Sequence, residues 1–180
     1  MFYLFGAQLA LFLSLILLSK KGKTSSDSIL TVWLVSIGLY LVLCYFRITN
    51  LDFNYPFLLG VIFPFPLIQG PLLFLYISAL TNQLARNKVL NFLHFLPALF
   101  SVLLFLPFYT LSSSDKILLF KNSGKGNETV MRINVFLILI SGVIYIVWSL
   151  ILLKRHKKNI LNQFSNTDKI NLKWLQYLIY

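Results

Sequence analysis

The chain has 180 residues, of which 58% are hydrophobic and 12% are charged, with a formal net charge of +11 and a mean hydropathy of +0.78. This composition excludes a water-soluble globular domain, because too few polar side chains are available to cover its surface. The apolar runs lack the alternation of a transmembrane β-barrel, so the sequence predicts an all-α fold, a polytopic bundle of transmembrane helices forming one domain over residues 1–180.

The first two apolar runs predict two membrane spans. Residues 2–19 are long enough to cross a hydrocarbon core of roughly 30 Å at about 1.5 Å per residue. No Lys or Arg precedes this run, whereas Lys20, Lys21 and Lys23 follow it. This charge order favours a retained helix over a cleaved signal peptide. The second span is predicted over residues 28–46, after a stretch of short oxygen-bearing side chains that suits a helix N-cap.

The third and fourth predicted spans, residues 57–80 and 90–111, are interrupted by proline. Because proline lacks an N–H and clashes with the preceding turn, both spans are expected to kink. We expect any conformational rearrangement of the bundle to occur at these positions. The five prolines are Pro64, Pro66, Pro71, Pro97 and Pro107.

A fifth span is predicted over residues 133–153. It is followed by the basic residues Lys154, Arg155, Lys157 and Lys158. Residues 171–180 form only the start of a sixth apolar run, because a membrane span needs about twenty residues. We therefore expect this chain to be the front part of a longer protein, with a segment lying along the membrane surface as the alternative.

Basic residues are unevenly divided between the two sides of the predicted bundle. The connections after the second and fourth runs hold five, and those after the first, third and fifth hold ten. By the positive-inside rule the side with ten faces the cytoplasm, so the N-terminus is predicted to lie outside. These side chains are expected to contact anionic lipid, and a dedicated binding patch is the alternative. The ten are Lys20, Lys21, Lys23, Arg86, Lys88, Lys154, Arg155, Lys157, Lys158 and Lys169.

The sequence offers few groups for catalysis, because all five acidic residues fall in predicted connections. No catalytic residue, metal site or cofactor is therefore predicted. Gln69 and His94 are the most polar side chains within or beside the apolar runs. The Gln69 amide is expected to bond a carbonyl freed by proline, or to line a small cavity. His94 is expected to lie at the lipid interface, with a protonatable switch as the alternative.

Several short segments together resemble a known family. They are residues 15–21 (LILLSKK), the tryptophan-containing second run around Trp33, residues 70–76 (GPLLFLY), residues 93–97 (LHFLP) and residues 170–175 (INLKWL). With them, the chain is similar to the membrane-embedded N-terminal half of AraC-type transcriptional regulators of Bacteroidetes-like bacteria. The resemblance implies a multi-pass protein of the bacterial inner membrane, with its N-terminus outside and a cytoplasmic helix-turn-helix module after the membrane helices.

The helix-turn-helix module itself is not part of this sequence, so no residue of this segment is expected to contact nucleic acid. Similar membrane halves also precede histidine-kinase modules. The expected function is a non-catalytic sensory or signal-input domain. It is expected to contact membrane lipid and to respond to a ligand that the sequence does not identify. A homo-oligomer is an alternative to a monomer. The alternatives are a small oligomeric transporter or channel subunit, in which the broken third span lines a pathway, and a structural membrane partner.

Overall fold

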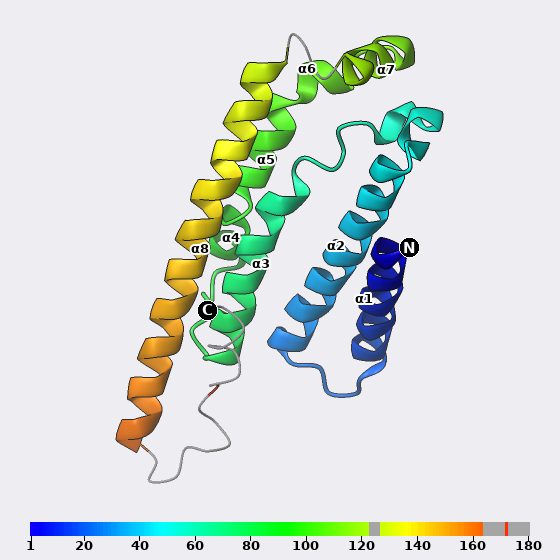
Figure 1. Cartoon of the computed structure of the whole chain (residues 1–180). Coiled ribbons are helices and arrows are strands. Elements are labelled where there is room, and N and C mark those ends of the chain that lie inside the picture. Colours follow the sequence, from blue (N-terminus) through cyan, green and yellow to red (C-terminus); the bar gives the residue numbers. More distant parts are fainter. Residues whose placement is uncertain (123–126, 164–171, 173–180) are drawn as a thin grey trace.

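The computed structural model describes residues 1–122, 127–163 and 172 (Figure 1). Every regular element within these residues is a helix, which confirms the predicted all-α fold. The long helices run alongside one another and form an elongated bundle (Figure 1). The predicted sixth run, residues 171–180, lies outside the described residues apart from Leu172.

Two antiparallel helices begin the bundle, α1 (Phe2–Ser19) and α2 (Ser25–Ile48). Helix α2 starts with a capping box, in which the Thr24 side chain accepts a hydrogen bond from the Asp27 N–H and the Asp27 carboxylate accepts one from the Thr24 N–H. Lys20 Nζ lies 2.7 Å from the same carboxylate. These polar contacts satisfy backbone donors at the helix start, as the short polar side chains predict.

Only the second part of the predicted third span forms the expected helix, α3 (Phe65–Leu80). Between α2 and α3 the chain forms two short 3-10 helices, η1 (Leu51–Asn54) and η2 (Pro56–Leu58). It then turns at Gly60, whose φ of +83° lies in the region that other residues rarely adopt. This turn delays the start of α3 relative to the predicted start at residue 57.

The predicted fourth run is divided into three helices instead of one kinked helix. They are α4 (Lys88–Leu93), α5 (Leu96–Leu104) and α6 (Leu106–Tyr109). Each of the last two starts one residue before a proline. Proline suits the first turn of a helix, where its missing N–H has no intrahelical partner to lose, so here it marks a new helix start.

The five prolines thus differ in their effect on the backbone. Pro64 is the N-cap of α3, and Pro66 lies in its first turn. Pro97 and Pro107 lie in the first turns of α5 and α6. Pro71 alone among the five lies inside a helix, where it removes a backbone donor from α3.

The last described helices are α7 (Ser113–Lys121) and α8 (Glu128–Gln163), and α8 has 36 residues. Among the described residues, three helices are long and apolar enough to cross a membrane, namely α1, α2 and α8. The predicted count of five spans and the start of a sixth is therefore not confirmed. Helix α3 has 16 residues, and the fourth run is broken into shorter pieces.

Helix α3 lies at the centre, between α2 and α8, and α1 packs on the far side of α2 (Figure 1). Tyr76 and Ile77 of α3 form a buried cluster with Leu153 of α8. Gly70 permits a close approach of these two helices, because a Cβ atom there would lie 2.8 Å from Cδ2 of Tyr145. Only 17% of the residues in the apolar stretch of each of α1, α2 and α8 are buried within the bundle, as expected of helices surrounded by lipid.

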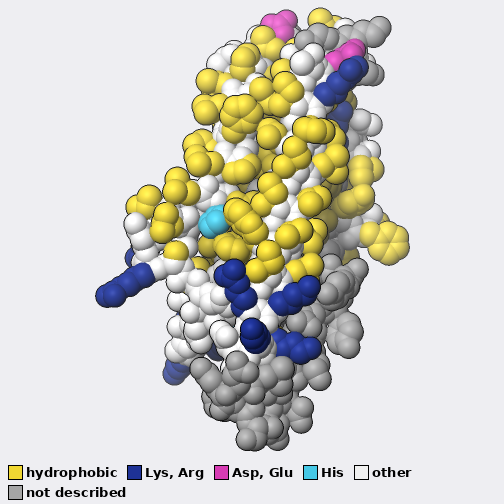
Figure 2. Space-filling view, turned by 90° about the vertical axis from the view of Figure 1, so that its left-hand side faces the viewer, with side chains coloured by type: hydrophobic (Ala, Val, Ile, Leu, Met, Phe, Trp, Pro, Cys, Tyr) yellow, Lys and Arg dark blue, Asp and Glu magenta, His cyan; other side chains and the backbone are white. Residues whose placement is uncertain are grey.

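Charged side chains separate toward the two ends of the bundle. Figure 2 shows Lys and Arg gathered at the lower end of one face and acidic groups near the upper end. The basic end, as we call it, is formed by nine described residues, Lys20, Lys21, Lys23, Arg86, Lys88, Lys154, Arg155, Lys157 and Lys158. The opposite end has four described basic residues, Arg47, Lys116, Lys121 and Arg132, and three of the acids, Asp52, Asp115 and Glu128.

Candidate functional site

Gln69 joins α3 to α2. Its Oε1 accepts a hydrogen bond from Trp33 Nε1 at 2.9 Å, and its Nε2 donates to Ser36 Oγ at 3.0 Å and to the Phe65 carbonyl at 3.2 Å. The indole N–H is a donor only, so it fixes which amide atom faces Trp33. Both N–H groups of the Gln69 amide therefore make hydrogen bonds within the bundle. The carbonyl that accepts one of them belongs to Phe65, one turn earlier in α3.

Replacing Gln69 by leucine is expected to lower the free energy of unfolding by about 1–2 kcal/mol, because Trp33 and Ser36 lose their partners across the α2–α3 interface. The measurement is an SDS titration of the protein in detergent micelles, followed by circular dichroism. Gln8→Leu is the matched control, since Gln8 lies exposed on α1. Equal stability of the two variants would contradict a structural role for the Gln69 amide.

His94 lies at the break between α4 and α5 and faces α8. The Tyr145 hydroxyl donates to the His94 carbonyl at 2.8 Å, and it also lies 3.3 Å from His94 Nδ1. Because the hydroxyl has a single proton, the imidazole contact requires Nδ1–H as the donor. The ring also packs against Phe74, with centroids 4.8 Å apart, and against Trp148 at 6.0 Å. His94 thus ties the helix break to α3 and α8.

A buried polar contact that the sequence analysis missed joins three segments near the end of the bundle opposite the basic end. Ser101 on α5 is completely buried, and its hydroxyl donates to Asn134 Oδ1 on α8 at 2.7 Å. Asn134 Nδ2 in turn donates to the Phe63 carbonyl, in the connection before α3, at 3.4 Å. An asparagine inside an apolar run was the available signal, because such a side chain needs a partner in a bilayer core.

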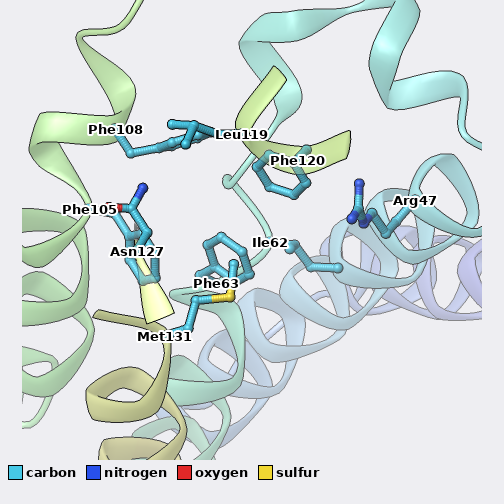
Figure 3. Close-up of a pocket in the computed structure, with 9 residues that line it drawn as sticks. All are labelled: Arg47, Ile62, Phe63, Phe105, Phe108, Leu119, Phe120, Asn127 and Met131. Carbon is cyan, nitrogen blue, oxygen red and sulfur yellow. The ribbon is translucent and has the colours of Figure 1, made fainter. Parts of the chain in front are cut away.

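One candidate site is a cavity of about 430 Å³ at the end opposite the basic end (Figure 3), and a cavity of about 490 Å³ also lies near the basic end, between α2, α3 and α4. The walls of the first cavity come from α2, the connection before α3, the α5–α6 region, α7 and the start of α8. The volume lies within the range of small-molecule sites. The lining residues are Arg47, Ile62, Phe63, Phe105, Phe108, Leu119, Phe120, Asn127 and Met131.

Four of the nine residues that line the cavity are phenylalanines (Figure 3). Phe63 and Phe105 are stacked with ring centroids 4.5 Å apart. Phe120 of α7 lies 6.2 Å from Phe63 and 5.4 Å from Phe108. The wall is thus apolar and built from flat groups contributed by segments distant in the sequence, which is typical of a binding site for an apolar ligand body.

Arg47 supplies the charge on the cavity wall. Its Nη1 donates to Asp52 Oδ2 at 3.0 Å, and its Cζ lies 4.4 Å from the centroid of the Phe120 ring. The Asp52 side chain is 7% exposed and that of Arg47 is 40% exposed. The guanidinium has five N–H donors, and the contact with Asp52 uses one of them. In the sequence, Arg47 ends the second apolar run and is one of the five basic residues in the connections after the second and fourth runs, so the pattern did not mark it as a binding residue.

Comparison of the chain with protein-family models gives no match, and comparisons with curated proteins and with solved structures give none either. The fold and the cavity together define a class, namely an α-helical membrane protein with a ligand-sized, aromatic-walled cavity at one end. The geometry of that cavity is therefore the basis for assigning a function.

Proposed function

We propose that this chain is the membrane-embedded sensory domain of a bacterial inner-membrane regulator, with its N-terminus outside and no catalytic role. The observation that carries the proposal is the position of the cavity, at the end opposite the nine basic residues. By the positive-inside rule the basic end faces the cytoplasm, so the cavity opens toward the outer side. A ligand from outside would then reach it without crossing the membrane.

The proposal includes five crossings. In addition to α1, α2 and α8, we assign one crossing to α3 with its preceding connection and one to the broken α4–α6 segment. This assignment places the connections after α1 and α3 and the end of α8 together at the cytoplasmic face. It also places the link from α2 to α3, helix α7 and the start of α8 together around the cavity.

The cavity wall supports a sensory role because its residues come from two groups of segments that are far apart in the sequence. Arg47 and Phe63 come from the side of α2 and α3, whereas Phe105 and Phe120 come from the α5–α7 side. A ligand that contacts both groups binds one relative arrangement better than another, which is the requirement for shifting a two-state equilibrium. The breaks before Pro97 and Pro107 offer places for such a shift, since the regular helix is already interrupted there.

The resemblance to AraC-type regulators adds the proposed output, transcriptional control by a helix-turn-helix module outside this segment. In the transporter alternative the broken third span lines a pathway, and substrate uptake would depend on Gln69. Because both amide N–H groups of Gln69 bond within the bundle, that side chain has less capacity to bind a passing substrate. We therefore keep the sensory domain as the single proposed function.

The proposed orientation predicts which exposed positions a membrane-impermeant maleimide can reach. Cys44 is the only cysteine, so Cys44→Ser provides a cysteine-free background for Ser114→Cys on α7 and Gln83→Cys after α3. In intact spheroplasts Ser114→Cys is expected to be labelled, whereas Gln83→Cys is expected to be labelled only after permeabilisation. The reverse pattern would place the cavity in the cytoplasm and contradict the proposed function.

A further inference from the structure

The cavity wall combines one guanidinium with a stack of phenyl rings, and we infer that its ligand is an amphipathic monocarboxylate whose apolar body lies among the rings and whose carboxylate binds Arg47. This inference rests on the proposed function, because it names the ligand of the same cavity. Arg47 is well suited to this role, since a planar guanidinium matches a carboxylate with two parallel hydrogen bonds.

The charges around Arg47 favour a single negative charge on the ligand. Asp52 balances one positive charge through its 3.0 Å contact with Arg47. Lys121 supplies a second positive charge nearby, because Lys121 Nζ and Arg47 Cζ lie 6.0 Å and 5.8 Å from the centroid of the same Phe53 ring. Arg132 is paired with Glu128 at 3.5 Å, so this exposed pair adds no net charge. Among the described residues, the sum of Arg47, Asp52 and Lys121 is +1, which one carboxylate neutralises.

The same charges disfavour other ligand classes. A cationic ligand would meet Arg47 and Lys121, and like charges at close range are unfavourable in a partly desolvated site. A ligand with two negative charges would exceed the local positive charge and lie close to Asp52, whose Oδ1 is buried without a hydrogen-bond partner. A neutral apolar ligand would leave the remaining Arg47 donors unused.

The rings set the nature of the apolar body. Phe63, Phe105 and Phe120 line the cavity, with Phe63 stacked against the other two rings, and Met131 adds an adaptable side chain (Figure 3). Asn127 lies on the other side of the ring cluster from Arg47 in this view. A ligand with an aromatic or short alkyl body therefore places its anionic group against Arg47. The other end of the ligand then lies within reach of the Asn127 amide.

The test uses matched probes with one body and different charges, namely 4-phenylbutyrate, 4-phenylbutanol and 4-phenylbutylamine, with decanoate as an alkyl carboxylate. Binding to the full chain in zwitterionic nanodiscs is measured by isothermal titration calorimetry. We expect phenylbutyrate to bind at least about tenfold more tightly than the alcohol, since hydrogen bonds to charged groups are the stronger ones, and we expect the amine to bind most weakly.

Two double variants show whether the preference comes from Arg47. Arg47→Gln with Asp52→Asn removes the pair without leaving a buried unpaired carboxylate, and it is expected to abolish the preference for the acid. Arg132→Gln with Glu128→Gln removes the exposed pair at the same end and is expected to preserve the preference. Thermal melts of both variants establish that they are folded.

Equal affinity of the wild-type protein for the acid and the alcohol would overturn the inference on ligand class and leave the cavity as a sensory site. Failure of both phenylbutyrate and decanoate to bind would also overturn it, as would a carboxylate preference that persists without Arg47. A failure of the proposed function is detected separately by the labelling of Ser114→Cys and Gln83→Cys, which needs no ligand.

Discussion

Replacing Gly60 by alanine is expected to destabilise the protein by roughly 2–5 kcal/mol, from backbone strain and overpacking together. The φ of +83° is unfavourable for any residue with a Cβ atom. That Cβ would also lie 2.8 Å from Cε1 of Phe108 and 3.1 Å from Cε1 of Tyr109. Tyr109 has little freedom to move away, because its hydroxyl donates to the Gly60 carbonyl at 3.0 Å.

Gly22→Ala separates the two contributions to this expected loss. Gly22 has a φ of +70°, but nothing lies within 4 Å of the position its Cβ would take. This variant is therefore expected to lose only the strain part, about 1–2 kcal/mol. Both variants are measured by SDS titration in detergent micelles. If Gly60→Ala lost no more stability than Gly22→Ala, the tight packing of α6 against this turn would be refuted.

Gly70→Ala is expected to cost about 1–3 kcal/mol, because the added methyl group meets Tyr145 of α8. The new Cβ would lie 2.8 Å from Cδ2 and 3.1 Å from Cβ of Tyr145. The Cβ of Tyr145 is attached to the backbone of α8, so relief requires the helices to separate. The hydrogen bond from the Tyr145 hydroxyl to the His94 carbonyl further restricts the ring.

The matched control for Gly70 is Gly142→Ala on α8, where a Cβ would meet nothing within 4 Å. Alanine has the higher helix propensity, so this variant is expected to keep or gain stability. Thermal melts in nanodiscs compare the two variants directly. A Gly70→Ala protein that melts at the wild-type temperature would show that α3 and α8 do not require this close contact.

The sequence predicted the helical fold well because the bilayer imposes a local rule, namely that apolar runs must satisfy their own backbone hydrogen bonds. Helix α1 has the bounds predicted from its apolar run and the lysines that follow it. The outcome at the prolines was harder to predict. Whether a proline kinks a helix or starts one depends on where the helix begins, and at α3 the turn at Gly60, packed against Phe108, delays that start.

The cavity was not predictable from local pattern. Its walls extend from Arg47 to Met131, and no spacing rule connects residues so far apart in the sequence. Phenylalanines near the ends of apolar runs are also usual at membrane interfaces. Their presence there does not show whether they line a ligand cavity or anchor a helix at the interface. By contrast, Gln69 stood out correctly as a polar group within an apolar run, although its partners Trp33 and Ser36 lie more than thirty residues away.

Helix α8 contains no proline and runs without interruption from the cavity wall to the basic end. From Met131 to Arg155 it is one continuous helix of 25 residues, about 36 Å long at the usual rise. A tilt of about 5° at the ligand end would therefore swing the far end by roughly 3 Å, comparable to the helix displacements of known switches. Under the proposed function, a small molecule in the cavity would thus have a mechanical means of moving the basic end, without any chain of side-chain contacts between the two.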